Sequence, residues 1–427
     1  MAIVMSDKLK IAVFHNLPLG GALRILYDHI LFLKSDGHQV DVYTPETSRT
    51  NFSPLENIAD NYFEFPVKNG FFRSFIIKLI NIFPLNFPIS ENSRFSVSFN
   101  QIKKVQREMA NDINNKNYDI VFVEQDGLFS YSPAILQYLH KPTIYYCQQP
   151  MRNDEITDNL NFKANKTLSN PIFKKFFYYS KGKWMAKDKY YAQYSKYTLA
   201  NSFFSHENIL KMHGKNSQVS YLGVDIDNFK PKNLDRENFV VSVGAIIPDK
   251  GHDFAIKALG KVNPDIRPEL YIIGYESTKT WREYLENLAK EENVTLKIFQ
   301  NVTNEELSEL YNKSKLSLFS QYLNPFGLVF LESMACGTPV IAVKEGGVRE
   351  VIKHNENSIL VPRDEDLFAK AITELLTNQD LWNKLSKNAI KTVNNHWTTK
   401  HAGKRLLDYM YEVIEKENLE YKDNNLH

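Results

Sequence analysis

The residues best suited to chemistry lie near the C-terminal end, between Ser317 and Gly347. A polar loop, Asn324-Pro325-Phe326-Gly327, precedes a predicted helix that carries Glu332, and Gly346-Gly347 follows a short apolar strand. Proline suits the first turn of a helix, where its missing N–H is not needed. Glycine lets a ligand approach the free backbone N–H groups there, and these groups favour phosphate. The spacing therefore predicts a site for a polyphosphate and a sugar.

The N-terminal half offers further candidates in the loops that follow its predicted strands. His15 and Gly20-Gly21 follow a buried strand at residues 10–14, although the dinucleotide fingerprint Gly-x-Gly-x-x-Gly is absent. Glu124-Gln125-Asp126 and Gln148-Gln149 follow two later strands. Polar groups at the carboxyl ends of parallel strands are what a substrate cleft supplies. The glycine pair could instead serve only the tight turn, and this alternative stays open.

The elements that must position these residues alternate between strand and helix along the whole chain. Such alternation predicts parallel sheets with helices on both faces, and 427 residues exceed one comfortable hydrophobic core. We therefore expect two α/β domains, residues 1–225 and residues 236–396, with a polar linker between them. Residues 50–70 are predicted to be irregular, and Ser205 is predicted to cap a helix over residues 206–212.

Composition and charge exclude several classes of protein. The net charge of +2 gives no general attraction to nucleic acid. The two cysteines, Cys147 and Cys336, lie in apolar contexts and are predicted to be small buried residues in a reducing cytosol. We expect no signal peptide at the N-terminus, and no segment approaches the apolar length of a membrane-spanning helix. We therefore expect a cytoplasmic protein.

Two basic, aromatic segments are candidates for contact with a membrane. Residues 71–83 are amphipathic, and residues 172–197 contain seven lysines, ten aromatic residues and one acid, Asp188. This pattern is typical of a segment that docks onto anionic lipid head groups, here at the cytoplasmic face of the membrane. A helix packed on its own sheet, with solvated lysines, explains the same pattern. No recognisable nucleic-acid-binding module accompanies the lysines, so we expect no nucleic-acid partner.

Two motifs of the C-terminal half carry a resemblance to a known family. Val243-Gly244-Ala245-Ile-Ile-Pro-Asp-Lys250-Gly251 resembles the family's Gly-Arg-Leu-x-Pro-Glu-Lys-Gly loop, and the nine residues from Asn324 to Glu332 resemble its Glu-x7-Glu element. In the first half, Gly20-Gly21, Ala200-Asn-Ser202 and Tyr221-Leu-Gly-Val-Asp225 match the family's usual loops. The chain thus resembles the retaining glycosyltransferases of family four (glycosyl transferases group 1).

The resemblance implies a GT-B architecture, with two Rossmann-like parallel-sheet domains facing a central cleft. The N-terminal domain would bind the acceptor and would be joined by the C-terminal helix at residues 397–416. The C-terminal domain would bind a UDP- or GDP-linked sugar. The hexose would pass to a glycan or a lipid-linked glycan with retention at the anomeric carbon. Neither a cofactor nor an obligatory metal ion would be needed.

The same resemblance implies the roles of individual residues. Lys250 would pair with the diphosphate, the backbone at Gly327-Leu328-Val329 would cradle the distal phosphate, and Glu332 would accept hydrogen bonds from the ribose. The catalytic candidates are Lys250, Glu332, Asn324 and Gln148. The predicted donor-binding residues are Gly20, Gly21, Gly244, Lys250, Asn324, Pro325, Phe326, Gly327, Leu328, Val329 and Glu332. The acceptor-side candidates are His15, Gln125, Gln148 and Gln149.

Three positions depart from the family's pattern. Ala245 stands where the family has a diphosphate-binding arginine, Asn324 where it has the first glutamate, and Gln148 where it often has a histidine. Asparagine and glutamine can hydrogen-bond a sugar hydroxyl but carry no charge. Arg349 or Lys344, beside the second glycine pair, could restore the missing charge. The departures leave open an alternative, a catalytically inactive GT-B protein that binds a glycan or a partner.

Overall fold

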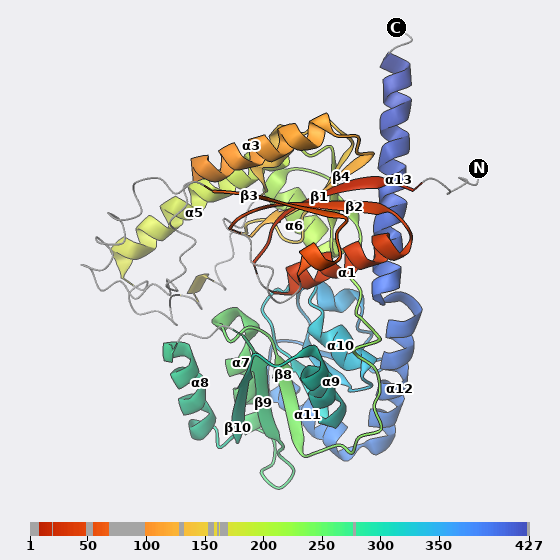
Figure 1. Ribbon diagram of the computed structural model, residues 1–427. Helices are drawn as coiled ribbons and strands as arrows, with labels where there is room; N and C mark the ends of the chain where they lie inside the picture. The colour runs from red at the N-terminus through yellow and green to blue at the C-terminus, as the bar shows by residue number, and fades with distance from the viewer. Residues whose placement is uncertain are drawn as a thin grey trace. The chain divides into compact units, whose positions relative to one another are not determined.

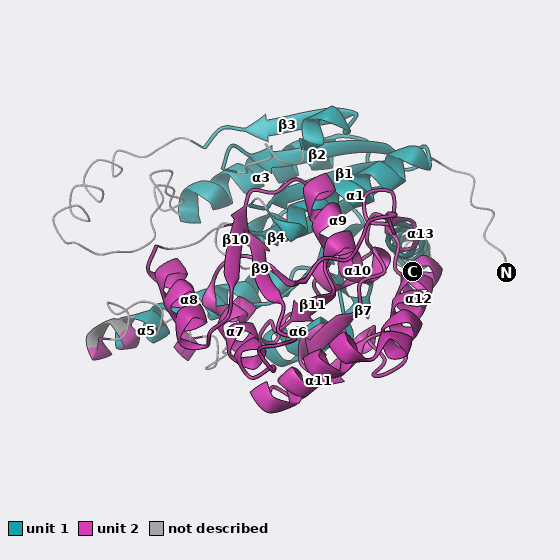
Figure 2. Ribbon diagram, turned by 90° about the horizontal axis from the view of Figure 1, so that it is seen from below, with its two compact units in different colours: residues 1–152, 175–221, 402–427 teal, residues 153–174, 222–401 magenta. Residues whose placement is uncertain are grey.

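The computed structural model describes residues 8–18, 20–47, 54–67, 99–127, 132–152, 158–159, 162, 170–275 and 279–424 (Figure 1). The basic segment predicted at residues 71–83 lies outside these described residues. The chain divides into two compact units (Figure 2). The first unit contains residues 1–152, 175–221 and 402–427, and the second contains residues 153–174 and 222–401.

A seven-stranded parallel sheet with the order β3-β2-β1-β4-β5-β6-β7 forms the centre of the first unit. Its strands are β1 (Lys10–Asn16), β2 (Gln39–Pro45), β3 (Asn61–Phe65), β4 (Ile120–Asp126), β5 (Thr143–Tyr146), β6 (Tyr197–Ala200) and β7 (Gln218–Val219). The central strands β1 and β4 are apolar and almost wholly buried. Such continuous apolar runs are typical of parallel strands that are covered on both faces.

Several helices accompany this sheet in the first unit. They are α1 (Gly21–Ser35), α3 (Phe99–Asn115), α5 (Pro171–Ala192), α6 (Phe203–His213) and α13 (Thr399–Asn424), with short 3-10 turns η1 (Leu55–Asn57) and η3 (Ala134–Gln137). On α3, Ile102, Met109 and Ile113 repeat at helical spacing and are fully buried. They share one core with Val121 and Val123 of β4, which fixes α3 against the sheet.

The second unit contains a six-stranded parallel sheet with the order β10-β9-β8-β11-β12-β13. Its strands are β8 (Phe239–Val243), β9 (Glu269–Gly274), β10 (Leu296–Gln300), β11 (Leu316–Phe319), β12 (Val340–Val343) and β13 (Ile359–Val361). The strands β8, β11 and β12 are neighbours in this sheet. The loops that follow them therefore leave the same edge, and the prediction of a parallel sheet in each half is confirmed.

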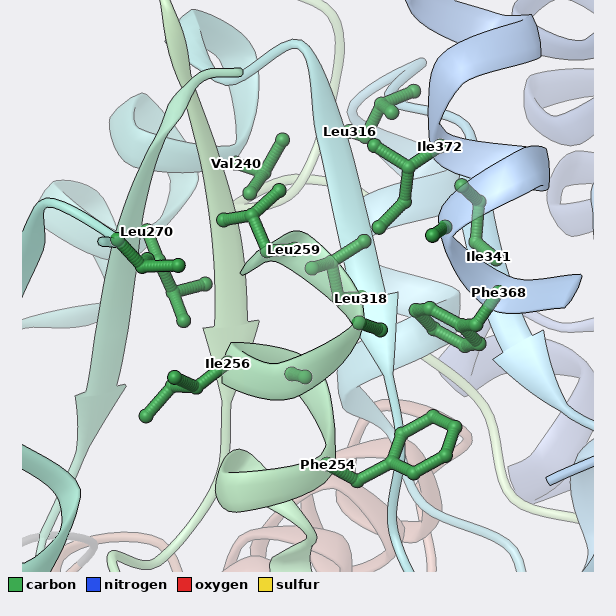
Figure 3. Packing of buried hydrophobic residues seen from close by; sticks show 14 of the residues in the cluster. Val240, Phe254, Ile256, Leu259, Leu270, Leu316, Leu318, Ile341, Phe368 and Ile372 are labelled. Atoms are coloured by element: carbon green, nitrogen blue, oxygen red, sulfur yellow. The ribbon is translucent and has the colours of Figure 1, made fainter. Parts of the chain in front are cut away.

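The helices of the second unit are α7 (His252–Gly260), α8 (Lys279–Glu291), α9 (Asn304–Lys313), α10 (Val329–Ala335), α11 (Glu365–Thr377) and α12 (Gln379–His396), with the 3-10 turns η4 (Pro248–Lys250) and η5 (Gly346–Glu350). The predicted capping box of Thr303 and Glu306 starts α9. Figure 3 shows Leu259 of α7 and Phe368 of α11 packed with the strand residue Leu318. This core holds α7, and with it the preceding loop, against the sheet.

Two local predictions were wrong, and one strand was missed. Residues 61–65 form the edge strand β3 instead of an irregular segment; the strand is partly exposed, so it lacks the continuous apolar run of a central strand. The short strand β13 was not predicted. Helix α6 begins at Phe203, and its cap is Ser202, whose Oγ accepts a hydrogen bond from Ser205 N at 3.0 Å. Ser202 has the extended backbone that a cap needs, whereas the predicted cap, Ser205, lies within the first turn of the helix.

The C-terminal helix α13 begins in the second unit and continues as part of the first. Within the first unit, Arg405 Nη2 donates to Tyr221 O at 3.0 Å, and Tyr409 Oη donates to Val219 O at 3.1 Å. Leu406 and Met410 are fully buried, so this helix belongs to the core of that unit.

Both cysteines of the chain are buried and form no disulfide, as predicted. Among the described residues, no helix is long and apolar enough to cross a membrane. In the same part of the chain, no group of three or more histidine, cysteine, aspartate or glutamate side chains is placed to hold a metal ion.

Candidate functional site

The first loop of the candidate donor site follows β8 and carries Lys250. Gly244 has a φ of 155°, and a Cβ there would lie 3.5 Å from Cγ and Cδ of Lys250, so the lysine stem passes over this glycine. Gly251, with a φ of 66°, turns the chain into α7. Lys250 Nζ lies 3.5 Å from Asp249 Oδ2, and 23% of the lysine side chain is exposed. The loop thus holds an accessible ammonium group at the carboxyl edge of the sheet.

Ala245, in the same loop, is buried and is held in place by a histidine. His252 Nε2 lies 3.2 Å from Ala245 O, and His252 Nδ1 lies 2.8 Å from Ser242 Oγ. Burial lowers the pKa of His252 to about 4, so the ring is neutral at physiological pH. A neutral ring can donate through Nε2 and accept through Nδ1, which satisfies both neighbours. In this chain, a buried alanine whose backbone oxygen contacts His252 therefore stands where the family has an arginine.

The second loop connects β11 to α10 and is closed by Asn324. Asn324 Oδ1 accepts a hydrogen bond from Phe326 N at 3.1 Å, and Asn324 Nδ2 donates to Gln321 Oε1. Gln321 Nε2 in turn donates to Val243 O, at the end of β8, at 3.2 Å. Both ends of the Asn324 amide are thus used within the protein. A sugar hydroxyl that binds this amide would have to replace one of these bonds.

The third loop, Gly346-Gly347, packs directly against the second. A Cβ on Gly346 would lie 2.1 Å from Asn324 O, and a Cβ on Gly347 would lie 2.1 Å from Pro325 O. Gly347 N also donates to Asn324 O at 3.0 Å. The close approach at this glycine pair is therefore made by the backbone of the second loop, and the approach of a ligand there stays a prediction.

Hydrogen bonds also join the first loop to the second. Tyr322 N donates to Asp249 O at 2.9 Å, and Ser320 Oγ donates to Gly251 O at 2.8 Å. The structure thus brings Gly244, Lys250 and the segment from Asn324 to Val329 to one edge of the sheet, and their role in binding a donor stays a prediction. The phosphate cradle at Gly327-Leu328-Val329 stays a prediction; Gly327 has a φ of 84°, and α10 begins directly after Leu328.

Glu332 lies on α10 and is fully buried. Its Oε2 accepts a hydrogen bond from Tyr311 Oη, on α9, at 3.1 Å. Tyr311 Oη also lies 3.1 Å from Val329 O, in the first turn of the same helix. Glu332 is therefore not a solvent-exposed acid on the helix surface. A buried carboxylate must be hydrogen-bonded, and Tyr311 supplies one partner.

Arg363, which the sequence reasoning missed, ties the loops together from the end of β13. Its guanidinium donates to both carboxylate oxygens of Glu345, at 2.8 and 2.7 Å, and to the carbonyls of Ser320 and Gln321, at 2.9 and 3.1 Å. It also lies 3.6 Å from the centre of the Tyr322 ring. Such a planar, five-donor group suits several carbonyls at once. Because the strand before it was not predicted, no local signal placed Arg363 here.

The two cations proposed to replace the missing arginine are both exposed. Arg349 Nε donates to Gly346 O at 2.9 Å, within its own turn. Lys344 follows β12 directly. Their contribution to a donor site stays a prediction.

The sequence similarity to a known protein family lies in the second of the two units. Residues 224–392, within the second unit, match the family model "Glycosyl transferases group 1". The second unit therefore resembles a group 1 domain. An uncharacterized glycosyltransferase of Methanocaldococcus jannaschii is 30% identical over 182 residues, which cover 42% of this chain and 46% of the relative. The matched part spans about half the length of the curated relatives it resembles.

Solved structures resemble both units. The sucrose-phosphate synthase of Thermosynechococcus elongatus has a TM-score of 0.71 at 17% identity, and the match covers 95% of this chain and 100% of that one. HepE of Anabaena, in complex with UDP and glucose, has a TM-score of 0.68 at 17% identity and covers 94% and 100%. Likeness at this identity shows the fold. The predicted pair of Rossmann-like domains with GT-B structural neighbours is confirmed.

Outside the residues that match this family model, the first unit holds the remaining donor-side candidates at the end of β1. Gly20 has a φ of 148°, and α1 begins at Gly21. A Cβ on Gly21 would meet no atom of the described residues within 4 Å, so packing does not require this glycine. His15 is fully buried, and burial lowers its pKa to about 3. It therefore stays neutral over the physiological range and brings no charge.

The acceptor-side glutamines lie at the ends of β4 and β5. Gln125 Nε2 donates to Gln149 O, and Gln149 N donates to Gln125 Oε1 at 3.2 Å. The side-chain amide of Gln125 therefore holds the backbone that follows β5 in place. Gln148 Nε2 donates to Glu124 Oε2 at 3.1 Å. Glu124 was not among the predicted site residues, although its place at a strand end was noted.

The basic helix α5 is anchored by its one acid. Asp188 is buried, and its Oδ1 accepts hydrogen bonds from Ser132 N and Oγ at 2.6 and 2.8 Å. Its Oδ2 accepts from Met151 N at 2.9 Å and lies 2.8 Å from His213 Nε2. The acid of this segment therefore faces the core, while Tyr178, Tyr179 and Tyr190 remain exposed.

Proposed function

We propose that this chain is a glycosyltransferase that moves a hexose from a UDP- or GDP-linked sugar to a glycan or a lipid-linked glycan. The observation that carries the proposal is the joined set of loops in the group 1 domain. There Lys250 offers an accessible ammonium group at the edge that also bears the segment from Asn324 to Glu332. HepE, a structural neighbour, was solved with UDP and with UDP-glucose, which supports a nucleotide-sugar partner.

The proposed reaction retains the configuration at the anomeric carbon. In this proposal the hydroxyl of the acceptor attacks from the face that the nucleotide leaves, and the departing phosphate takes its proton. Lys250 would neutralise the charge that develops on the diphosphate. Glu332 would accept hydrogen bonds from the ribose. With a lysine in this role, the proposal requires no divalent metal ion and no dedicated base.

A panel of UDP- and GDP-linked hexoses tests this proposal. A bound donor stabilises the folded state by mass action, and the free energy of unfolding rises by about 2.7 kcal/mol when the ligand is at 100 times its Kd. The midpoint of thermal unfolding therefore rises. We expect one nucleotide series to stabilise the chain and to release its nucleoside diphosphate when an acceptor is added. The absence of both stabilisation and release across the panel would contradict the proposal. Stabilisation without release from any acceptor would favour the inactive glycan- or partner-binding alternative.

We further propose that α5 brings the protein to an anionic membrane surface. Lys175, Lys183 and Lys189 are exposed on this helix, and the acid of the segment is buried in the core. The exposed side therefore presents positive charge together with tyrosine rings, for example Lys183 Nζ at 4.3 Å from the centre of the Tyr179 ring. Amphipathic aromatic rings suit the boundary between lipid and water.

Liposome flotation tests the membrane proposal. Changing Lys175, Lys183 and Lys189 to glutamine should weaken binding to phosphatidylserine vesicles about 100-fold, because each lysine near the surface contributes about 1 kcal/mol. The matched control changes three exposed lysines of the second unit, Lys279, Lys353 and Lys384, and should leave binding unchanged. High salt should release the protein. Equal losses in both triple variants, or binding that ignores lipid charge, would contradict a specific role of α5.

A further inference from the structure

A buried carboxyl group lies beside Gln148 and has no role in the site described so far. Glu124 is fully buried at the end of β4. Its Oε2 accepts from Gln148 Nε2 at 3.1 Å, while its Oε1 is buried without a hydrogen-bond partner among the described residues. A buried oxygen that lacks a partner costs free energy, so this arrangement needs an explanation. The pair bridges the ends of two adjacent strands, because Glu124 stands opposite Tyr146 in the register of β4 and β5.

Gln148 stands at the surface end of this pair. About 9% of the residue is exposed, and its backbone oxygen is held by Ser205 Oγ at 2.9 Å. One N–H of its Nε2 is engaged by Glu124, so its Oε1 is the acceptor of the amide that is left for a ligand. An amide presents a donor on one side and an acceptor on the other. Whichever group Glu124 binds therefore decides what Gln148 presents to a substrate.

We propose that Glu124 is a positioning residue that orients the Gln148 amide toward a hydroxyl group of the acceptor sugar. The proposal rests on the proposed glycosyltransferase function. An ionised Glu124 can only accept, so it holds Gln148 Nε2 and turns Gln148 Oε1 outward as a hydrogen-bond acceptor. When Glu124 is protonated, its O–H forms a hydrogen bond by donating to Gln148 Oε1. An O–H on Glu124 Oε1 would instead have no partner among the described residues. Rotation of the amide would then present Nε2 to the sugar.

The protonation of Glu124 should change within an accessible range of pH. Burial raises its pKa from an ordinary value of 4.5 to about 8, and the bond from Gln148 opposes this rise. The titratable groups on the same face are Tyr146 on β5, His29 on α1 and Arg405 on α13, with Cys147 just after β5. Burial raises the pKa of Tyr146 and of Cys147 well above their ordinary values and lowers that of His29 to about 4. Of these groups, Glu124 is the one that titrates near pH 8.

The first arm of the test needs no substrate. Infrared difference spectra of the whole chain, recorded between about pH 6 and about pH 10, follow the C=O stretch of protonated carboxyl groups. We expect a band that is lost with a midpoint near pH 8, the raised pKa of Glu124, and that is missing from Glu124→Gln. In Gln148→Leu the midpoint should rise, because the hydrogen bond that favours the ionised form is gone. The absence of such a band from the unaltered protein, or an unshifted midpoint in Gln148→Leu, would overturn the proposed pair.

The second arm measures transfer from the donor found in the panel to methyl glycosides of glucose, galactose, mannose and N-acetylglucosamine. The kcat/KM for the glycoside should rise about tenfold from about pH 7 to about pH 9, as one group ionises. Glu124→Gln should remove this rise. Asp126→Asn is the matched control, since Asp126 is a buried carboxylate on the same strand, held by Asn16 and Gln106 at 2.8 Å each. It should lower stability and keep the rise.

The two arms separate failure of the inference from failure of the proposed function. A rise that persists in Glu124→Gln would overturn the positioning role while leaving the glycosyltransferase proposal intact. If no variant transfers sugar to any glycoside although the infrared band titrates and shifts as expected, the proposed pair stands and the acceptor role assigned to it is overturned. Gln148→Ala should lower kcat/KM for the glycoside about tenfold at about pH 9, as expected for one lost hydrogen bond.

Discussion

Replacing Lys250 by alanine should lower the rate of nucleotide-sugar turnover at least about 100-fold, with little change in the midpoint of thermal unfolding. Removing one group that stabilises charge in a transition state typically costs this much. The fold makes little use of the lysine, because its Nζ pairs with the Asp249 carboxylate at 3.5 Å and its side chain is partly exposed. A turnover assay with the donor identified by the panel, run beside thermal unfolding, measures both quantities.

Lys261→Ala is the matched control for this change. Lys261 lies at the other end of α7, just after its last residue, and forms ion pairs with Glu365 and Asp366 at 3.4 and 2.9 Å. Exposed pairs of this kind contribute less than about 1 kcal/mol. The control should therefore retain turnover. Inorganic pyrophosphate offers a second measurement, because Lys250→Ala should weaken its binding as well as that of UDP or GDP. Unchanged turnover in Lys250→Ala would contradict the assigned role.

The loops of the second unit could be predicted from the sequence because the residues that define each loop are close together in the chain. Proline, glycine and lysine follow β8 within a few positions, and the segment from Asn324 to Glu332 is continuous. The bonds that join these loops could not be predicted in this way. Arg363 reaches carbonyls more than 40 positions earlier, at Ser320 and Gln321, and it follows a three-residue strand with little periodicity of its own.

In the first unit, a polar residue at a strand end did not reveal its own surroundings. Gln125 and Glu124 are neighbours on β4 and their side chains point to opposite faces, as alternation along a strand requires. Gln125 meets the backbone of Gln149, whereas Glu124 is buried and meets Gln148. Which of the two strand faces hides a polar side chain depends on the helices that cover the sheet. No spacing in the sequence records that packing, so the buried carboxyl group was missed.

Glu332→Gln should weaken the binding of UDP or GDP about 10- to 100-fold. A hydrogen bond to a charged group contributes about 1.5–3 kcal/mol, and an amide offers one accepting oxygen where a carboxylate offers two. The substitution keeps the shape of the side chain, and its amide oxygen can still accept from Tyr311 Oη. The helix should therefore stay in place. Isothermal titration calorimetry with the nucleoside diphosphate measures the loss.

Two further measurements decide whether Glu332 binds the ribose or only supports the fold. Inorganic pyrophosphate has no ribose, so Glu332→Gln should bind it as the unaltered protein does, in contrast to Lys250→Ala. Tyr311→Phe keeps the carboxylate and removes its hydroxyl partner on α9, which should cost about 1 kcal/mol of stability. If Glu332 only stabilises the fold, both variants will lose stability and neither will change the affinity for the nucleotide. If it binds the ribose, nucleotide affinity will fall far more in Glu332→Gln than in Tyr311→Phe.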